Sequence, residues 1–148
     1  AGLRAMRHHM DRAALQEFHA HHKLLLMAWD EKSLRTLGPL AADAHIPIDE
    51  AIGRYCSLFM EALKKFPSTG SHVNVLEHVL GFFSKAISAE RKKIFTGALD
   101  QYRRKKIPLS RCLELARSLI EEHDIEYLKE QVYFNPFPVE LVLNSNSA

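Results

Sequence analysis

Asparagine, histidine and lysine recur at helical spacing in the middle of the chain, and these residue types bind anions. Asn74, His78, Gly81 and Lys85 stand at i, i+4, i+7 and i+11, which places them along one face of a predicted helix. His72 is expected near the start of that helix, where free backbone N–H groups and the positive end of the helix dipole favour anions. Glycine inside a helix costs about 1 kcal/mol relative to alanine, so we expect Gly81 to allow a close helix crossing. The stripe is a candidate anion-binding face, and a merely solvated polar face is the alternative.

Positive charge is concentrated just after this stripe. The formal net charge is only +2. Residues 91–106 nevertheless contain seven basic residues and one acidic residue, Asp100. The basic residues are Arg91, Lys92, Lys93, Arg103, Arg104, Lys105 and Lys106. Such clustering suits a polyanion, and His22, Lys23 and Tyr102 would add charge, hydrogen bonds and stacking if their helices were neighbours. The competing explanation is favourable charge at a helix C-terminus, which accounts for two or three of these residues.

Other chemistries find less support. His19 and His22 stand at i, i+3, but no carboxylate partner is identifiable, and His72 and His78 align poorly, so we expect neither a metal site nor a cofactor. The two cysteines are isolated in apolar helical patterns and predict buried, reduced thiols. No nucleophile elbow or glycine-rich phosphate loop occurs, and nothing in the sequence indicates an enzyme. Acid–base catalysis by His72 and His78 stays open as an alternative.

The elements that would position these residues are helices. Apolar residues at three- and four-residue spacing predict helices from Asp11 (interrupted at Gly38-Pro39), after Pro47, over 73–87, after Ser88 and after Pro108. A short helix to Gln131 is expected to follow a break at His123-Asp124. The fold class is therefore all-α: a compact single-domain bundle of five to six helices with an extended Pro/aromatic C-terminal strap.

The ends of the chain differ from the helical part. We expect residues 1–10 to be a leader, linker or cloning remnant, residues 11–143 to form the helical domain and residues 144–148 to be a disordered tail. No apolar run approaches the roughly 20 residues that span a bilayer, and no secretory signal is recognisable. These features predict a cytoplasmic protein without membrane contact.

Several ordered motifs resemble those of the YbgA-like bacterial family. They are Phe18-x-x-x-His22-Lys23, Tyr55-x-x-x-Phe59-x-x-Ala62-Leu63, His72-x-Asn74-Val75-Leu76-x-His78-x-x-Gly81-Phe82-Phe83-x-Lys85, Tyr102-Arg103, Ile107-Pro108-Leu109 and Tyr127-Leu128-x-x-Gln131-x-Tyr133-Phe134-x-Pro136-Phe137-Pro138. The resemblance covers roughly residues 12–143. It implies a domain long regarded as of unknown function, which occurs alone or fused behind a thiouracil or thiouridine desulfidase domain. Because this chain lacks cluster-binding cysteines, the resemblance implies an accessory role, such as holding transfer RNA.

Three hypotheses follow for the function. The first is a non-catalytic domain that binds RNA, with transfer RNA as the expected ligand, through phosphate contacts. Its expected anion-binding residues are His22, Lys23, His72, Asn74, His78, Lys85, Arg91, Tyr102 and Arg103. The second is a helical domain that docks onto a partner enzyme, such as a desulfidase domain in cis or in trans, through an apolar patch near Phe82, Trp29 or the aromatic tail. The third is a histidine-dependent enzyme. The oligomeric state is not indicated.

Overall fold

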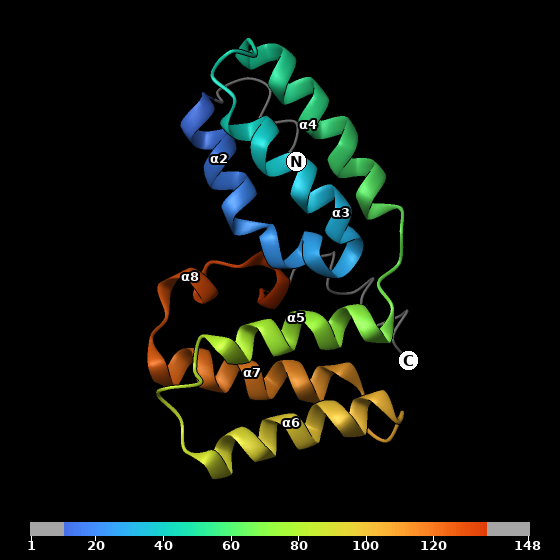
Figure 1. Ribbon diagram of the computed structural model, residues 1–148, viewed down its shortest axis with the longest axis vertical. Helices are drawn as coiled ribbons and strands as arrows, with labels where there is room; N and C mark the ends of the chain where they lie inside the picture. Colours follow the sequence, from blue (N-terminus) through green and yellow to red (C-terminus); the bar gives the residue numbers. More distant parts are fainter. Residues whose placement is uncertain (1–10, 136–148) are drawn as a thin grey trace. The chain divides into compact units, whose positions relative to one another are not determined.

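The computed structural model describes residues 11–135, and these form seven α-helices, one 3-10 helix and no strand. The elements are α2 (Arg12–His21), α3 (Lys23–Ala42), α4 (Ile48–Leu63), α5 (Thr69–Gly81), α6 (Ala89–Arg103), α7 (Leu109–His123), α8 (Glu126–Lys129) and η1 (Val132–Phe134) (Figure 1). This confirms the all-α prediction. The helices fall into two compact groups, one within Ala1–Phe66 and one within Pro67–Ala148, and each is described by itself. The prediction of one domain over 11–143 stays a prediction.

The first group contains α2, α3 and α4, and α3 packs against both of the others. Helix α2 starts where the sequence predicted, because the Asp11 carboxylate accepts the Ala14 N–H at 2.8 Å. The helix predicted to follow without interruption instead breaks at His22, whose φ of −109° and ψ of 8° are not helical. This break turns one predicted helix into two and raises the number of helices above the expected five to six.

Helix α3 contradicts the predicted interruption at Gly38-Pro39, since it runs through both residues to Ala42. The discontinuity lies earlier, at Asp30, which has an extended backbone (φ −161°, ψ 91°). Its carboxylate accepts hydrogen bonds from the Ser33 hydroxyl at 2.6 Å and the Lys65 ammonium at 2.8 Å. It also accepts one from the Ser33 backbone amide, so it caps the second half of the helix. Pro39 is exposed and lies three residues before the end of the helix, so the carbonyl that loses its N–H partner is only one turn further back, at Arg35.

Helix α4 supplies the aromatic part of this group's core. Tyr55 and Phe59, one turn apart, are buried and stack on each other with ring centroids 6.0 Å apart. The ring of Phe18 from α2 meets both edge-on. The helix predicted after Pro47 is therefore confirmed, with Ile52, Tyr55 and Phe59 buried, whereas Phe66 lies beyond the helix and is exposed.

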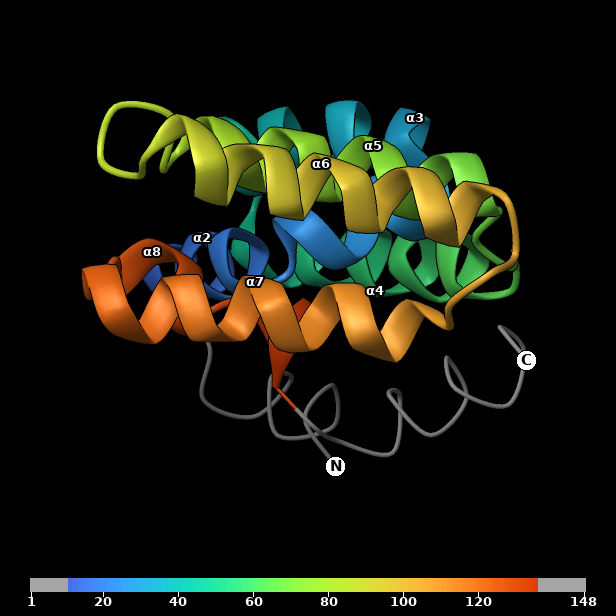
Figure 2. The same cartoon turned by 90° about the horizontal axis from the view of Figure 1, so that it is seen from below.

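The second group is built on α5, α6 and α7, which pack pairwise, and Figure 2 shows α6 and α7 lying lengthwise beside each other. Helix α5 begins at a Ser68 cap and ends at Gly81, six residues before the predicted end. The amides of Phe82 and Phe83 bond back to the carbonyls three residues earlier, which tightens the last turn and closes the helix. Buried Phe83 then anchors the following turn.

Helix α6 starts at the predicted Ser88 cap and ends in a Schellman motif. The Lys106 N–H bonds to the Gln101 carbonyl at 2.8 Å, and the Lys105 N–H bonds to the Tyr102 carbonyl at 2.9 Å. Lys105 consequently has a φ of 62°, in the left-handed region that favours glycine. Helix α7 starts after Pro108, as predicted, and ends at His123, and the Asp124 C-cap that follows is also left-handed (φ 53°).

The remaining sequence predictions concern the ends and the thiols. The predicted short helix before Gln131 is α8, and η1 follows it. The predicted strap continues beyond Asn135, so most of it lies outside the described residues, as do the predicted leader and tail. Both cysteines are buried thiols, as predicted, and burial raises the pKa of the Cys112 thiol to about 11. Within residues 11–135, the helices are too short or too polar to cross a membrane.

Candidate functional site

The predicted site residues divide between the two groups of helices. His22 and Lys23 belong to the first group, at the junction of α2 and α3, and the other seven belong to the second. The His22 ring stacks on Phe18, with centroids 3.9 Å apart, and its Nδ1 lies 2.7 Å from the Phe18 carbonyl oxygen. Burial lowers the pKa of His22, so its neutral form is favoured. Lys23 is exposed.

His72 is a core residue of the second group. Its side chain is 2% exposed, and its Nδ1 lies 2.7 Å from the Tyr133 hydroxyl. Burial lowers the pKa of this imidazole to about 4, so the ring is neutral at physiological pH. The sequence carried a signal for this placement, because His72 precedes Leu76 by four residues and Val79 by seven and so continues their buried stripe.

The predicted stripe on α5 is shorter than expected. Asn74 and His78 are exposed on the helix, and the His78 ring meets Phe82 edge-on. Lys85 lies in the turn after α5, so its expected alignment with the stripe is wrong. A Cβ atom on Gly81 would meet nothing within 4 Å, so the expected close helix crossing is also wrong.

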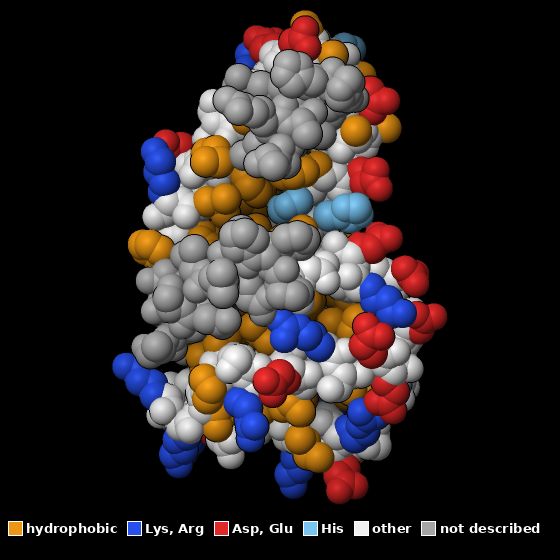
Figure 3. All heavy atoms as spheres, turned by 180° about the vertical axis from the view of Figure 1, so that it is seen from behind, with side chains coloured by type: hydrophobic (Ala, Val, Ile, Leu, Met, Phe, Trp, Pro, Cys, Tyr) orange, Lys and Arg blue, Asp and Glu red, His pale blue; other side chains and the backbone are white. Residues whose placement is uncertain are grey.

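The predicted residues on α6 are largely engaged with neighbouring helices. Tyr102 is buried and hydrogen-bonds to Thr69. Arg103 pairs with Glu77 of α5 at 2.7 Å, and Arg91 pairs with Glu122 of α7 at 2.5 Å. On the face drawn in Figure 3, Lys and Arg side chains are likewise interspersed with Asp and Glu. The basic stretch is therefore partly neutralised.

Unneutralised cations remain at the end of α6 and across from it on α7. Arg104 pairs with Asp100 at 3.2 Å, but Lys105 and Lys106 have no carboxylate within 4 Å among residues 11–135. The same holds, within that part of the chain, for Lys93 and Arg111. All four side chains are exposed. We call Lys105, Lys106 and Arg111 the basic end of the second group, whereas Lys93 lies near the start of α6 and is not part of it.

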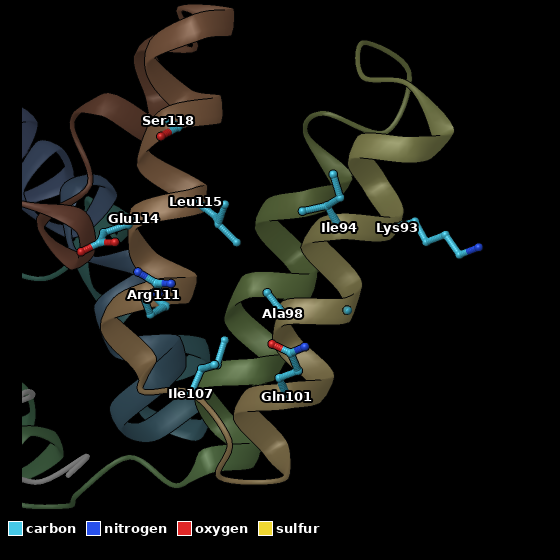
Figure 4. Close-up of a pocket in the computed structure, with 10 residues that line it drawn as sticks. Lys93, Ile94, Ala98, Gln101, Ile107, Arg111, Glu114, Leu115 and Ser118 are labelled. Carbon is cyan, nitrogen blue, oxygen red and sulfur yellow. The ribbon is translucent and has the colours of Figure 1, made fainter.

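A groove of about 670 Å³ runs between α6 and α7 beside these cations (Figure 4). Its apolar lining includes Ile94, Ala98 and Leu115, and Lys93 and Arg111 are also among its lining residues. Ile94 is 57% exposed, an unusual fraction for a large aliphatic side chain. The groove was not predicted from the sequence, because it depends on how two helices pack.

The first group contains a second hollow that sequence reasoning also missed. It has a volume of about 510 Å³ and lies between α2 and α3. Its polar lining consists of Gln16, His19, Lys23 and Arg35, and apolar surface comes from Ala20, Leu34, Pro39 and Ala41. From the sequence, His19 was considered only as a metal ligand together with His22, and no carboxylate partner was found for that role. The described residues contain no group of three or more side chains able to hold a metal ion.

These observations define an all-α protein with buried histidines and two hollows at helix pairs. A family model described as "Protein of unknown function (DUF1722)" matches residues 23–138, and the chain belongs to this family. A relative in Escherichia coli (strain K12), "Uncharacterized protein YbgA", is 29% identical over 137 residues, which cover 91% of this chain and 81% of the relative. The YbgA-like resemblance is thereby confirmed. No solved structure matches significantly.

Proposed function

We propose that this chain is a non-catalytic RNA-binding domain that contacts the phosphate backbone through the basic end of its second group. The observation that carries the proposal is the pair Lys105 and Lys106, two adjacent exposed ammonium groups without a carboxylate within 4 Å in the described chain. Neighbouring ammonium groups repel each other, and phosphates would relieve that repulsion and release counterions.

The conformation of Lys105 supports a role other than stability. A left-handed C′ position favours glycine, and lysine there costs about 1 kcal/mol. The favourable interaction of a positive charge with the helix C-terminus offsets only about 0.3–1 kcal/mol of this conformational cost. The fold therefore gains little from lysine at this position, whereas a phosphate-binding surface gains a cation held on a fixed turn.

The paired arginines can join such a surface. The ion pair of Arg103 with Glu77 is about half exposed on both sides, and exposed pairs contribute only about 0–1 kcal/mol. A phosphate offers the guanidinium the same bidentate geometry as a carboxylate. Arg103 can therefore exchange partners at small cost, and Arg104 can do the same.

The placement of the histidines argues against the enzyme alternative. His72 is buried against Tyr133 and His78 is exposed on the same helix, so the two imidazoles do not face a common reacting group. The resemblance to domains fused to desulfidases makes transfer RNA the first RNA to test and a desulfidase domain the expected catalytic partner.

The test is fluorescence anisotropy of labelled bulk transfer RNA titrated with the protein at several salt concentrations. We expect affinity to fall steeply with salt. The double variant Lys105→Gly, Lys106→Gln should weaken binding about tenfold and reduce the salt slope by about 2, one unit for each phosphate that the variant no longer neutralises. Because glycine suits the left-handed turn, this variant should fold at least as well as the parent.

Lys64→Gln is the matched control. Lys64 is an exposed lysine in the other group of helices, paired with Glu61, and its removal should leave the affinity unchanged. Absence of binding at low ionic strength would refute the proposal. If Lys64→Gln weakened binding equally, only overall charge would be sensed, and the assignment to Lys105 and Lys106 would be wrong.

The groove between α6 and α7 favours a second candidate function, docking of a partner protein. Exposed Ile94 next to Leu115 provides an apolar contact surface. Of the patches expected from the sequence, Phe82 is partly exposed and Trp29 is buried. Docking at the groove predicts that Ile94→Asp abolishes partner binding and that this binding depends little on salt, which separates it from RNA binding.

A further inference from the structure

The hollow between α2 and α3 in the first group is lined by hydrogen-bond donors. Lys23 and Arg35 are cations, and Gln16 supplies an amide. Among the described residues, no Asp or Glu lines it, and the nearest carboxylate interaction is a loose pairing of Arg35 with Glu31 at 3.9 Å. A hollow with two cations and no lining carboxylate attracts anions.

His19 adds a donor whose direction is fixed by the core. Its side chain is 6% exposed, and its Nδ1 lies 2.8 Å from the hydroxyl of fully buried Tyr55. Among residues 11–135 the Tyr55 hydroxyl has no other hydrogen-bond partner, so the O–H must donate to Nδ1 to be satisfied. Nδ1 is then the acceptor, and the ring hydrogen is on Nε2.

The Nε2 atom faces the hollow beside Gly38. A Cβ atom built on Gly38 would lie 3.3 Å from Nε2, so glycine at this position leaves the N–H uncovered. Within the described chain Nε2 has no hydrogen-bond partner, although the ring is almost fully buried. Burial, followed by the charge of Lys23 and the neighbouring His22, lowers the pKa of His19 to about 4, so the ring remains a neutral N–H donor at physiological pH.

From this geometry we infer that the hollow between α2 and α3 binds the anionic group, phosphate or carboxylate, of a small organic molecule. His19 Nε2–H, Lys23 and Arg35 hold the anion, and Leu34 and Pro39 contact the apolar body of the ligand. The volume of about 510 Å³ exceeds that of a bare ion and lies in the range of small-molecule pockets. The site is independent of the proposed RNA surface, which lies on the other group of helices.

Three probes with the same aromatic body test the inference: phenyl phosphate, benzoate and neutral benzyl alcohol. Binding to the whole chain is followed by the ring nitrogen NMR signals of His19, assigned by their absence in His19→Gln. We expect one or both anions to shift these signals saturably and benzyl alcohol to leave them unchanged. The tighter of the two anions identifies phosphate or carboxylate as the preferred group.

Two substitutions locate the binding site. Arg35→Gln removes a largely exposed cation, so it leaves folding intact and should weaken binding at least about tenfold. Gly38→Ala should weaken it similarly by covering Nε2 with a methyl group, while alanine also raises helix propensity.

The matched controls lie on α4. Arg54→Gln removes a cation that is paired at i, i+4 just as Arg35 is, and Gly53→Ala adds a methyl group with nothing within 4 Å. Both should leave the affinity unchanged. The inference is overturned if neither anion binds, if benzyl alcohol binds as well as the anions, or if the controls weaken binding as much as Arg35→Gln.

Discussion

Acidification should destabilise the second group of helices through His72, and the structure sets the size of the effect. Burial holds the pKa of this imidazole at about 4, against 6.5 for an ordinary histidine. Between pH 6.5 and pH 4 the His72 ring is therefore protonated in the unfolded chain and neutral in the folded chain. The stability contribution is complete above pH 6.5 and is lost progressively as pH falls towards 4, by about 2 kcal/mol between pH 7.5 and pH 5.

The double variant His72→Phe, Tyr133→Phe isolates this contribution. It removes the titrating ring together with the Tyr133 hydroxyl that hydrogen-bonds to it, so that hydroxyl is not left buried without the His72 ring. Urea unfolding followed by circular dichroism at both pH values measures the result. The parent should lose about 2 kcal/mol more than the variant, or about 1 M in urea midpoint.

The exposed His78→Gln on the same helix is the control, and it should keep the parent's pH dependence. If the double variant loses as much stability on acidification as the parent, burial of His72 does not control its titration. The placement of that ring in the core would then be refuted.

Three further substitutions test the packing of the second group. Gly97→Ala in the middle of α6 should raise the free energy of unfolding by about 0.5–1 kcal/mol, because the added methyl group meets nothing within 4 Å; a lower melting temperature would contradict the open groove. Phe83→Ala should cost about 3–5 kcal/mol, since the ring is fully buried and anchors the turn after α5; a loss below 1 kcal/mol in urea unfolding would contradict this anchoring role. Glu122→Gln, which removes the partner of Arg91, should leave the urea unfolding midpoint nearly unchanged, and a clear decrease would mean that the pair is more than a surface contact.

Local signals predicted where most helices begin. Asp11 and Ser88 cap helices through hydrogen bonds to amides three residues ahead, and Pro108 precedes α7. Such caps involve only neighbouring residues, so they can be recognised without knowledge of the fold. Helix α5 is the exception, because it is capped by Ser68 and begins at Thr69, four residues before the predicted start. The end of α5 was predicted too late, because Phe83 continues the helical spacing of apolar residues. In the structure Phe83 is buried but belongs to the turn after the helix.

The candidate site was less predictable than the fold. Asn74 and His78 are exposed as expected, because a helical wheel separates polar from apolar faces. His72 and Tyr102 were predicted to bind anions but are buried. Rings with both a polar and an apolar part occur in cores and on surfaces, so their burial depends on residues far away in the sequence. Arg103 was predicted as a cation, but its pairing with Glu77 requires two helices to lie side by side.

The sequence by itself determined the helical class, most helix starts, the buried cysteines and the family resemblance, since these depend on residue type and short-range spacing. Tertiary structure decided which polar groups are available to a ligand. The His72–Tyr133 pair joins residues 61 positions apart, and Gly38 leaves His19 uncovered only because two helices meet there. Whether a histidine is enclosed in the core, as His72 is, or faces a pocket, as His19 does, depends on contacts between residues far apart in the sequence.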